Sequence, residues 1–235
     1  MKAEMGLMVP GLPQGLLASL AQQVDDLGLG RLALVGGAVR DALLHQRCSD
    51  PWRQPTDLDL VLEGSCEAFV HRLQDTFGPQ RVSQVLLHEQ FGTAELLIDG
   101  VLLDLAAARI ETYPAPGQNP IVEPGALDED LARRDFTVNA MAVVLQSDGS
   151  QHLMDPHGGL EHLLKRQLAF LHEGSVTDDP TRVIRAARYG ARLGFRLAPE
   201  ALSQVERTLA AWPWAWHHGD PVDAVPPALG TRLRM

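Results

Sequence analysis

The segment 56-TDLDLVLEG-64 decides the fold, because two acids interrupt a pattern that is otherwise typical of a β-strand ending at Gly64. Residues two apart on a strand project to the same face, so Asp57 and Asp59 stand side by side. Asp is depleted in strands, and an unpaired buried carboxylate is costly. A divalent cation removes the repulsion, and Mg²⁺ prefers carboxylate oxygens and is commonly shared with substrate phosphates. A solvated edge strand is the alternative, but the apolar residues around the pair argue against it.

A third acid, Asp104, stands alone in the apolar strand 101-VLLDLAAAR-109. A neighbouring strand can bring it to the pair formed by Asp57 and Asp59. Three clustered carboxylates can hold two metal ions, the arrangement used for in-line attack on a phosphoryl group. The alternative is an isolated edge acid or a salt bridge from Asp104 to Arg109.

The stretch 34-LVGGAVRD-41 combines a strand, two glycines and a helix predicted to begin near Ala38. Glycines at such a turn let backbone N–H groups approach a phosphate, and a helix N-terminus favours anions. Arg40 would lie in the first helical turn, close enough to help. The pattern is neither G-x-G-x-x-G nor a Walker P-loop. Taken alone, it favours a tight strand–helix turn with Arg40 and Asp41 as a surface pair.

Two further motifs place arginines beside acids. In 133-RRDFTVNAMA-142, Arg can clamp phosphate or ribose and Asp can accept a sugar hydroxyl, although a cation pair ending a helix is the simpler interpretation. In 178-DDPTRVIRAAR-188, Pro180 suits the first turn of a helix, on which Asp179 and Arg182 are neighbours. For a generic sequence, a capped and solvated helix is the usual explanation of this second motif.

Composition limits the protein class. The chain has 235 residues, 45% of them hydrophobic, and no apolar run long enough to span a bilayer. We therefore expect a cytoplasmic protein with no membrane partner, and the two cysteines suggest neither a disulfide framework nor a zinc site. The net charge of −10 argues weakly against nucleic acid as a partner. However, residues 182–196 hold five arginines and no acid, so a local basic stripe is compatible with this charge.

Periodicity predicts an α+β chain with two units and a boundary near residues 150–160. The first unit alternates strands and helices, and its Asp99-Gly100 turn predicts a hairpin. The Pro/Gly-rich segment 114–126 is predicted to be a loop. The part after about Asp155 is predicted to be wholly helical.

Taken in order, the motifs GG-x-V-R-D, D-L-D, R-R-D-F-T-x-N-A, D-P-x-G-G and D-D-P-x-R-x-x-R-x-x-R resemble those of the class II tRNA nucleotidyltransferase and bacterial poly(A) polymerase family. The resemblance covers roughly residues 31–197. It implies a polymerase-β-like nucleotidyltransferase head with a mixed sheet over residues 1–154. An all-α neck that contacts the nucleotide base and RNA would follow over residues 155–235. The ending 230-GTRLRM-235 resembles the start of a further motif, so we expect this neck to be incomplete.

The resemblance also implies roles for individual residues. It makes Asp57 and Asp59 the Mg²⁺ ligands, and Asp104 a third catalytic carboxylate that activates the primer 3′-hydroxyl. The implied nucleotide-binding residues are Gly36, Gly37 and Arg40 for the triphosphate, Arg134 and Asp135 for telling ribose from deoxyribose, Asp179 and Arg182 for the edge of the base, and Asn139, Arg185 and Arg188 for further contacts with the nucleotide.

The implied function is Mg²⁺-dependent, template-independent transfer of CMP and AMP from CTP and ATP to the 3′ end of tRNA. The loop at residues 114–126 holds no Arg or Lys, which leaves CCA, CC-only and A-only addition open. A bacterial poly(A) polymerase is one alternative. Another is a fragment that binds nucleotide but cannot hold tRNA. The oligomeric state and the role of the Trp/His segment 212–218 are left open.

Overall fold

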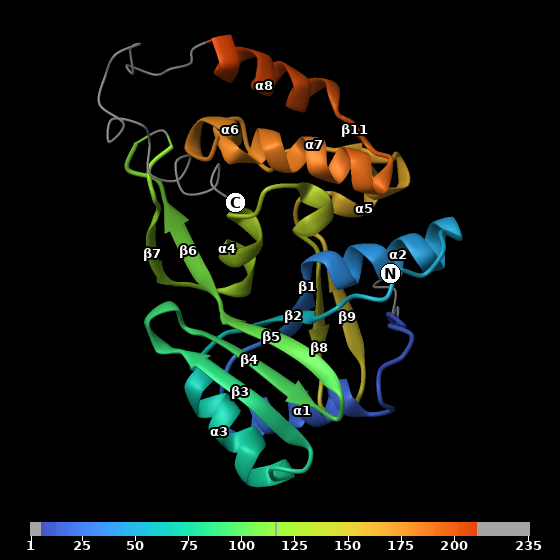
Figure 1. Cartoon of the computed structure of the whole chain (residues 1–235), viewed down its shortest axis with the longest axis vertical. Coiled ribbons are helices and arrows are strands. Elements are labelled where there is room, and N and C mark those ends of the chain that lie inside the picture. Colours follow the sequence, from blue (N-terminus) through green and yellow to red (C-terminus); the bar gives the residue numbers. More distant parts are fainter. Residues whose placement is uncertain (1–5, 116, 211–235) are drawn as a thin grey trace.

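The computed structural model describes residues 6–115 and 117–210, and its centre is a seven-stranded mixed sheet in the order β3-β4-β5-β2-β1-β8-β9 (Figure 1). The strands of this sheet are β1 (Leu32–Val35), β2 (Leu58–Leu62), β3 (Val82–His88), β4 (Thr93–Ile98), β5 (Val101–Ala107), β8 (Ala142–Leu145) and β9 (Gln151–Met154). A two-stranded ribbon, β6 (Arg109–Thr112) and β7 (Ile121–Pro124), extends from it. The segments 212–218 and 230–235 lie outside the described residues.

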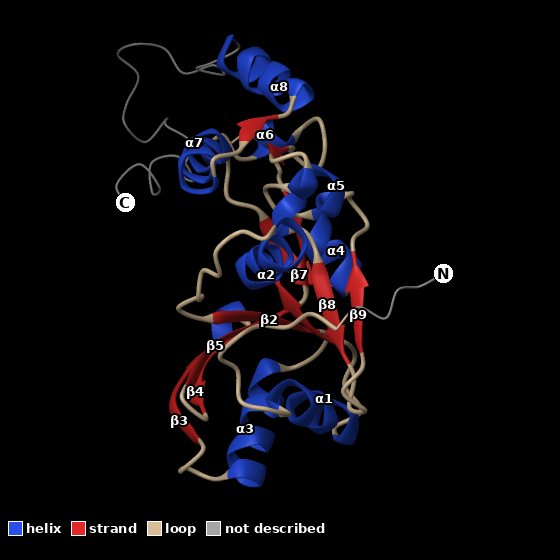
Figure 2. Ribbon diagram, turned by 90° about the vertical axis from the view of Figure 1, so that its right-hand side faces the viewer, coloured by secondary structure: helices blue, strands red, loops and turns tan. Residues whose placement is uncertain are grey.

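The helices are α1 (Leu16–Asp26), α2 (Gly36–Cys48), α3 (Cys66–Phe77), α4 (Leu127–Ala132), α5 (Gly159–Leu164), α6 (Ser175–Asp178), α7 (Thr181–Leu193) and α8 (Pro199–Ala210). Two 3₁₀ turns, η1 (Glu89–Phe91) and η2 (Thr137–Asn139), also occur. Helices α1 and α3 pack side by side against one face of the sheet, whereas α7 and α8 lie beyond α5 at the opposite end of the molecule (Figure 2). None of the described helices is both long enough and apolar enough to cross a membrane.

Strands β2 and β5 form the parallel pair of this sheet, and all of its other described pairs are antiparallel. The chain reaches β5 through α3 and the β3–β4 hairpin, because parallel neighbours need a crossover rather than a tight turn. The predicted hairpin turn joins β4 to β5, where Asp99 and Gly100 have φ angles of 49° and 82°. Positive φ at both central residues is the requirement of a type I′ turn.

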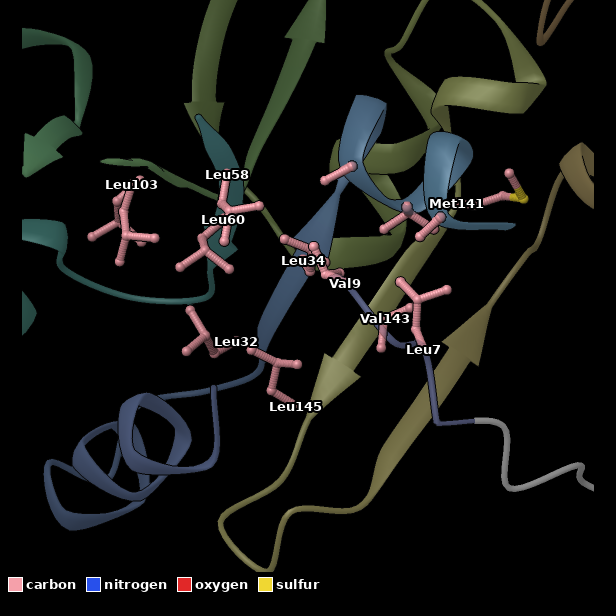
Figure 3. Close-up of a cluster of buried hydrophobic side chains, with 14 of the residues drawn as sticks. Leu7, Val9, Leu32, Leu34, Leu58, Leu60, Leu103, Met141, Val143 and Leu145 are labelled. Carbon is pink, nitrogen blue, oxygen red and sulfur yellow. The ribbon is translucent and has the colours of Figure 1, made fainter. Parts of the chain in front are cut away.

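The two faces of the sheet carry different side chains. Leucines of β1, β2 and β5 point into the main core beside Val143 and Leu145 of β8 (Figure 3). Alternate residues of the same strands point to the other face, where Val61 and its neighbours pack under α4 in a second, smaller core. Asp59 and Asp104 have the same alternation as Val61, so they lie on the face opposite the leucines.

The structure corrects three local predictions. Helix α2 begins at Gly36 rather than near Ala38. The segment 114–126 is not only loop, because β7 pairs with β6 in antiparallel register. Between Asp155 and Ala210 the chain is not wholly helical, because it contains a short parallel pair, β10 (Gln167–Leu168) with β11 (Arg196–Leu197). Two-residue strands such as these carry no periodic signal that a sequence can reveal.

Candidate active site

Three carboxylates meet at one end of β2. The parallel register places Asp59 directly opposite Asp104, and Asp57 precedes β2 by one residue. One ligand oxygen from each of these acids lies within 4.8 Å of the others. The predicted carboxylate cluster is therefore present, and the alternative salt bridge is wrong, because Arg109 pairs with Glu111 at 2.7 Å instead.

The surroundings of this cluster disfavour its full ionisation. Desolvation raises the pKa of Asp59, and the negative charge of Asp57 raises it further, while Arg134 and Arg40 act in the opposite direction. Desolvation, the hydrogen bond with Asp57 and nearby negative charges raise the pKa of Asp104 to about 6. Like charges held at this distance cannot all ionise without a compensating cation.

The donor set fits a hard divalent metal ion. The cluster offers only carboxylate oxygens, which suit Mg²⁺, Mn²⁺ or Ca²⁺ and not the soft metals that prefer thiolates. Cys66, the nearest thiol along the chain, is buried in the main core, and burial raises its pKa to about 12. Asp57, Asp59 and Asp104 would therefore be the residues that hold the metal.

Helix α2 begins beside the carboxylates. Gly36 has a φ of 68°, a conformation that side chains rarely adopt. A Cβ atom at Gly36 would lie 3.2 Å from Asp59 Oδ2 and 3.4 Å from a terminal nitrogen of Arg134, so glycine permits the close approach of these groups. The following helix turn presents its free N–H groups here, a favourable position for a phosphate.

Beside the carboxylates the structure has a polar cleft of about 320 Å³. Every predicted nucleotide-binding residue except Arg40 and Arg188 lines it. The lining residues are Gly36, Gly37, Asp59, Arg109, Glu111, Tyr113, Arg133, Arg134, Asp135, Asn139, Asp179, Arg182, Arg185 and Tyr189.

Arg40 lies behind this cleft. Its side chain is 1% exposed, donates to Asp41 at 2.8 Å and to Asn139 at 2.6 Å, and so forms a buried pair rather than a surface pair. Asn139 in turn donates to Asp135, which accepts a 2.6 Å hydrogen bond from Arg185. This chain of hydrogen bonds links α2, the turn η2 and α7.

Helix α7 forms the far wall of the cleft. Arg182 donates to the backbone carbonyls of Ser175 and Arg133, at 3.3 and 2.8 Å. The guanidinium of Arg185 lies 5.6 Å from the ring centroid of Tyr189, within cation–π range. Arg188, one helical turn further on, is exposed and does not line the cleft.

Sequence reasoning missed the contribution of the β6 ribbon. Arg109, Glu111 and Tyr113 alternate along this segment, so they share one face of the strand and reach the cleft together. Glu111 accepts from both other side chains and from Arg133, and desolvation together with Glu111 raises the pKa of Tyr113 to about 12. The period-two pattern of 109-RIETY-113 is the signal that could have revealed this strand.

Comparison with known proteins identifies the family to which this chain belongs. Residues 32–169 match the poly A polymerase head domain. The chain is 47% identical to a CC-adding tRNA nucleotidyltransferase of Deinococcus radiodurans over 180 residues, and 42% identical to an A-adding tRNA nucleotidyltransferase of Aquifex aeolicus over 170 residues. These alignments cover 76% and 72% of this chain, and 45% and 19% of the relatives.

Solved structures with the same fold include a CCA-adding enzyme in its apo form II, with a TM-score of 0.76 and 31% identity over 87% of this chain and 46% of that chain. Another is a tRNA nucleotidyltransferase complexed with a primer tRNA and an incoming ATP analog, with a TM-score of 0.68 and 36% identity over 81% of this chain and 50% of that chain. The described chain thus spans about half the length of these structures. With its head-domain match, its mixed sheet and its carboxylate cluster, the chain belongs to the tRNA nucleotidyltransferase and poly(A) polymerase head-domain family.

Proposed function

We propose that this chain transfers CMP or AMP from CTP or ATP to the 3′ end of tRNA, with Mg²⁺ and without a nucleic-acid template. The observation that carries this proposal is the register of β2 with β5, which sets Asp59 opposite Asp104 at the mouth of an arginine-lined cleft. A carboxylate cluster that can hold metal ions, beside a helix N-terminus that favours phosphate, is a combination suited to phosphoryl transfer.

In the proposed reaction, the primer 3′-oxygen forms a bond to the α-phosphorus of the nucleotide. The bond from that phosphorus to the bridging oxygen breaks, and pyrophosphate leaves. The carboxylates would hold Mg²⁺, which would supply charge neutralisation at the transferring phosphoryl group. Asp104 accepts the proton of the 3′-hydroxyl, since it lies directly opposite Asp59 in the register of β2 with β5.

The remaining lining residues bind and orient the nucleotide. The N-terminus of α2 with Gly36 and Gly37 holds the triphosphate, and Arg134 lies next to this position. Asp179 and Arg182 offer an acceptor and a donor on the far wall, as the edge of a base requires. Arg40 contributes by fixing Asn139 from behind the cleft rather than by contacting phosphate.

The test is nucleotide addition to tRNA lacking its terminal CCA, with CTP alone, ATP alone and both together. We expect incorporation that depends on Mg²⁺ and is lost in Asp104→Asn, while Asp128→Asn, an exposed carboxylate of α4, behaves like the parent. Long A tails made with ATP alone would favour the poly(A) polymerase alternative.

A second candidate is a unit that binds nucleotide and metal without turning tRNA over, since the carboxylate cluster and the arginine-lined cleft both lie within the described residues. Nucleotide binding without incorporation would select it. Failure to bind CTP or ATP would contradict both candidates.

A further inference from the structure

The wall between two neighbouring clefts is built from Arg133 and Arg134. Both arginines line the nucleotide cleft, and both line a second cleft of about 350 Å³ on the other side of the carboxylates, which Asp59 and Asp104 also line. Two cations therefore stand beside the acids that would hold the metal. A guanidinium that paired with one of these acids would compete directly with a divalent cation.

A buried acid under this wall holds both arginines. Asp130 of α4 is 0% exposed, and each of its two oxygens accepts from a different guanidinium. Oδ1 accepts from Arg133 at 2.6 and 2.9 Å, and Oδ2 accepts from Arg134 at 2.9 and 3.3 Å. Charge-assisted hydrogen bonds to both oxygens of one carboxylate fix the direction of each guanidinium.

Arg134 lies close to Asp59 without pairing with it. One terminal nitrogen of Arg134 and one oxygen of Asp59 approach the same point above Gly36, within 3.4 and 3.2 Å. Within residues 6–115 and 117–210, however, the ion pair of Arg134 is made with Asp130. Its other contact is a long hydrogen bond of 3.4 Å to the Asn139 carbonyl.

We propose that Asp130 is a positioning residue that holds Arg134 away from Asp59 and thereby keeps this carboxylate available to a divalent cation. The inference rests on the metal site of the proposed function and adds a residue that does not touch the metal. Arg133 depends less on Asp130, because Glu111 also accepts from it at 3.0 Å. Loss of the Asp130 charge therefore releases Arg134 in particular.

The variant Asp130→Asn keeps the shape of the side chain but removes its charge and one acceptor oxygen. The freed guanidinium can then pair with Asp59, because an oxygen of Asp59 and a terminal nitrogen of Arg134 already approach the same point above Gly36. The probe is Mn²⁺ titrated into the full chain without nucleotide or tRNA, followed by calorimetry. We expect the Kd for Mn²⁺ to rise about tenfold, which corresponds to ~1.4 kcal/mol of competing ion pairing.

The double variant Asp130→Asn/Arg134→Gln separates this mechanism from general damage to the site. Removal of the competing guanidinium should restore the Kd to within about threefold of the parent, a difference of less than 1 kcal/mol. Asp128→Asn is the matched control, since Asp128 lies on the same helix, is exposed and pairs with Arg31. An unchanged Kd in Asp130→Asn, or a double variant as weak as the single one, would overturn the proposal.

Mn²⁺ binding by two further variants, Arg134→Gln and Asp59→Asn, separates the role of Asp130 from the existence of the metal site. If Asp130→Asn does not fold, Arg134→Gln alone is measured: it should bind Mn²⁺ within about threefold of the parent. A much tighter Kd in Arg134→Gln would mean that Arg134 already pairs with Asp59, which contradicts the proposal. If the parent and Asp59→Asn bind Mn²⁺ equally, the metal site itself is wrong. If only Asp59→Asn weakens binding, the metal site stands and the role of Asp130 alone is rejected.

Discussion

Strand β2 carries acids near both of its ends, and the two ends behave in opposite ways. At one end Glu63 accepts from the Arg31 side chain at 2.6 Å and from the backbone N–H groups of Arg31 and Leu127. The hydrogen bond from the Arg31 guanidinium is the main reason that the pKa of Glu63 falls to about 2. At the other end Asp59 faces Asp57 and Asp104, and desolvation raises its pKa.

The difference lies in the partners rather than in the acids. Glu63 joins β1, β2 and α4 through donors that the fold itself supplies. The acids at the opposite end have mainly one another, an arrangement that costs free energy until a cation binds. A carboxylate with its donors in place stabilises a fold, whereas a cluster without them indicates a ligand site.

Leu60→Ala should have the largest effect on the free energy of unfolding. Leu60 lies between the two ends of β2 and is fully buried in the main core. Truncation of a buried leucine removes apolar contact and leaves a cavity, so we expect a loss of about 3 kcal/mol in the free energy of unfolding. Urea denaturation measures it. A loss near zero would contradict the assignment of the leucine face to the core.

Glu63→Gln should have the next largest effect, a loss of about 2 kcal/mol at neutral pH, since a pKa lowered from 4.5 to about 2 reflects preferential binding of the ionised form in the folded state. This stability is present above the unfolded pKa of 4.5 and is lost as the pH falls towards 2. The variant and the parent should therefore converge in acid.

Asp75→Asn is the control for this substitution, because Asp75 is an exposed carboxylate of α3. We expect its unfolding curve to follow that of the parent at every pH. A Glu63→Gln variant as stable as the parent at pH 7 would remove the distinction between the two ends of β2.

Asp59→Asn should have the smallest effect on stability, and of the opposite sign. Without metal it relieves repulsion among carboxylates that remain partly open to solvent, so we expect a gain of no more than about 1 kcal/mol. In the folded state the pKa of Asp104 is about 6, above its ordinary value of 3.8, so the folded protein takes up this proton first as the pH falls. The metal-free parent should therefore become more stable relative to its unfolded state between pH 6 and pH 4. This gain in stability should be smaller in Asp59→Asn. An equally large gain in the variant would mean that groups outside the carboxylate cluster cause the pH dependence.

The fold and the carboxylate cluster are predictable from sequence because their signals are local. Short apolar runs identify β2 and β5, the Asp99-Gly100 turn identifies the hairpin, and acids in apolar strands identify the site. Contacts between distant segments are not predictable in this way. The burial of Arg40 against Asn139, 99 residues away, depends on how α2 packs against η2.

The same limit explains why Asp130 and Glu111 were missed. Asp130 is three and four residues before the arginines that it holds, a spacing common on any exposed helix. Only its complete burial distinguishes it from a surface pair. Glu111 belongs to a ribbon whose second strand, β7, lies within the Pro/Gly-rich segment 114–126 and has no apolar alternation strong enough to predict.

The most direct test of the account is thermal unfolding of the full chain and of Asp59→Asn, with and without saturating Mg²⁺. A ligand that binds only the folded state stabilises it by about 2.7 kcal/mol at one hundred times its Kd. We therefore predict that Mg²⁺ raises the unfolding midpoint of the parent by several degrees and leaves that of Asp59→Asn almost unchanged. Equal shifts in both proteins, or no shift in the parent, would contradict the claim that the carboxylate end of β2 is a divalent-cation site.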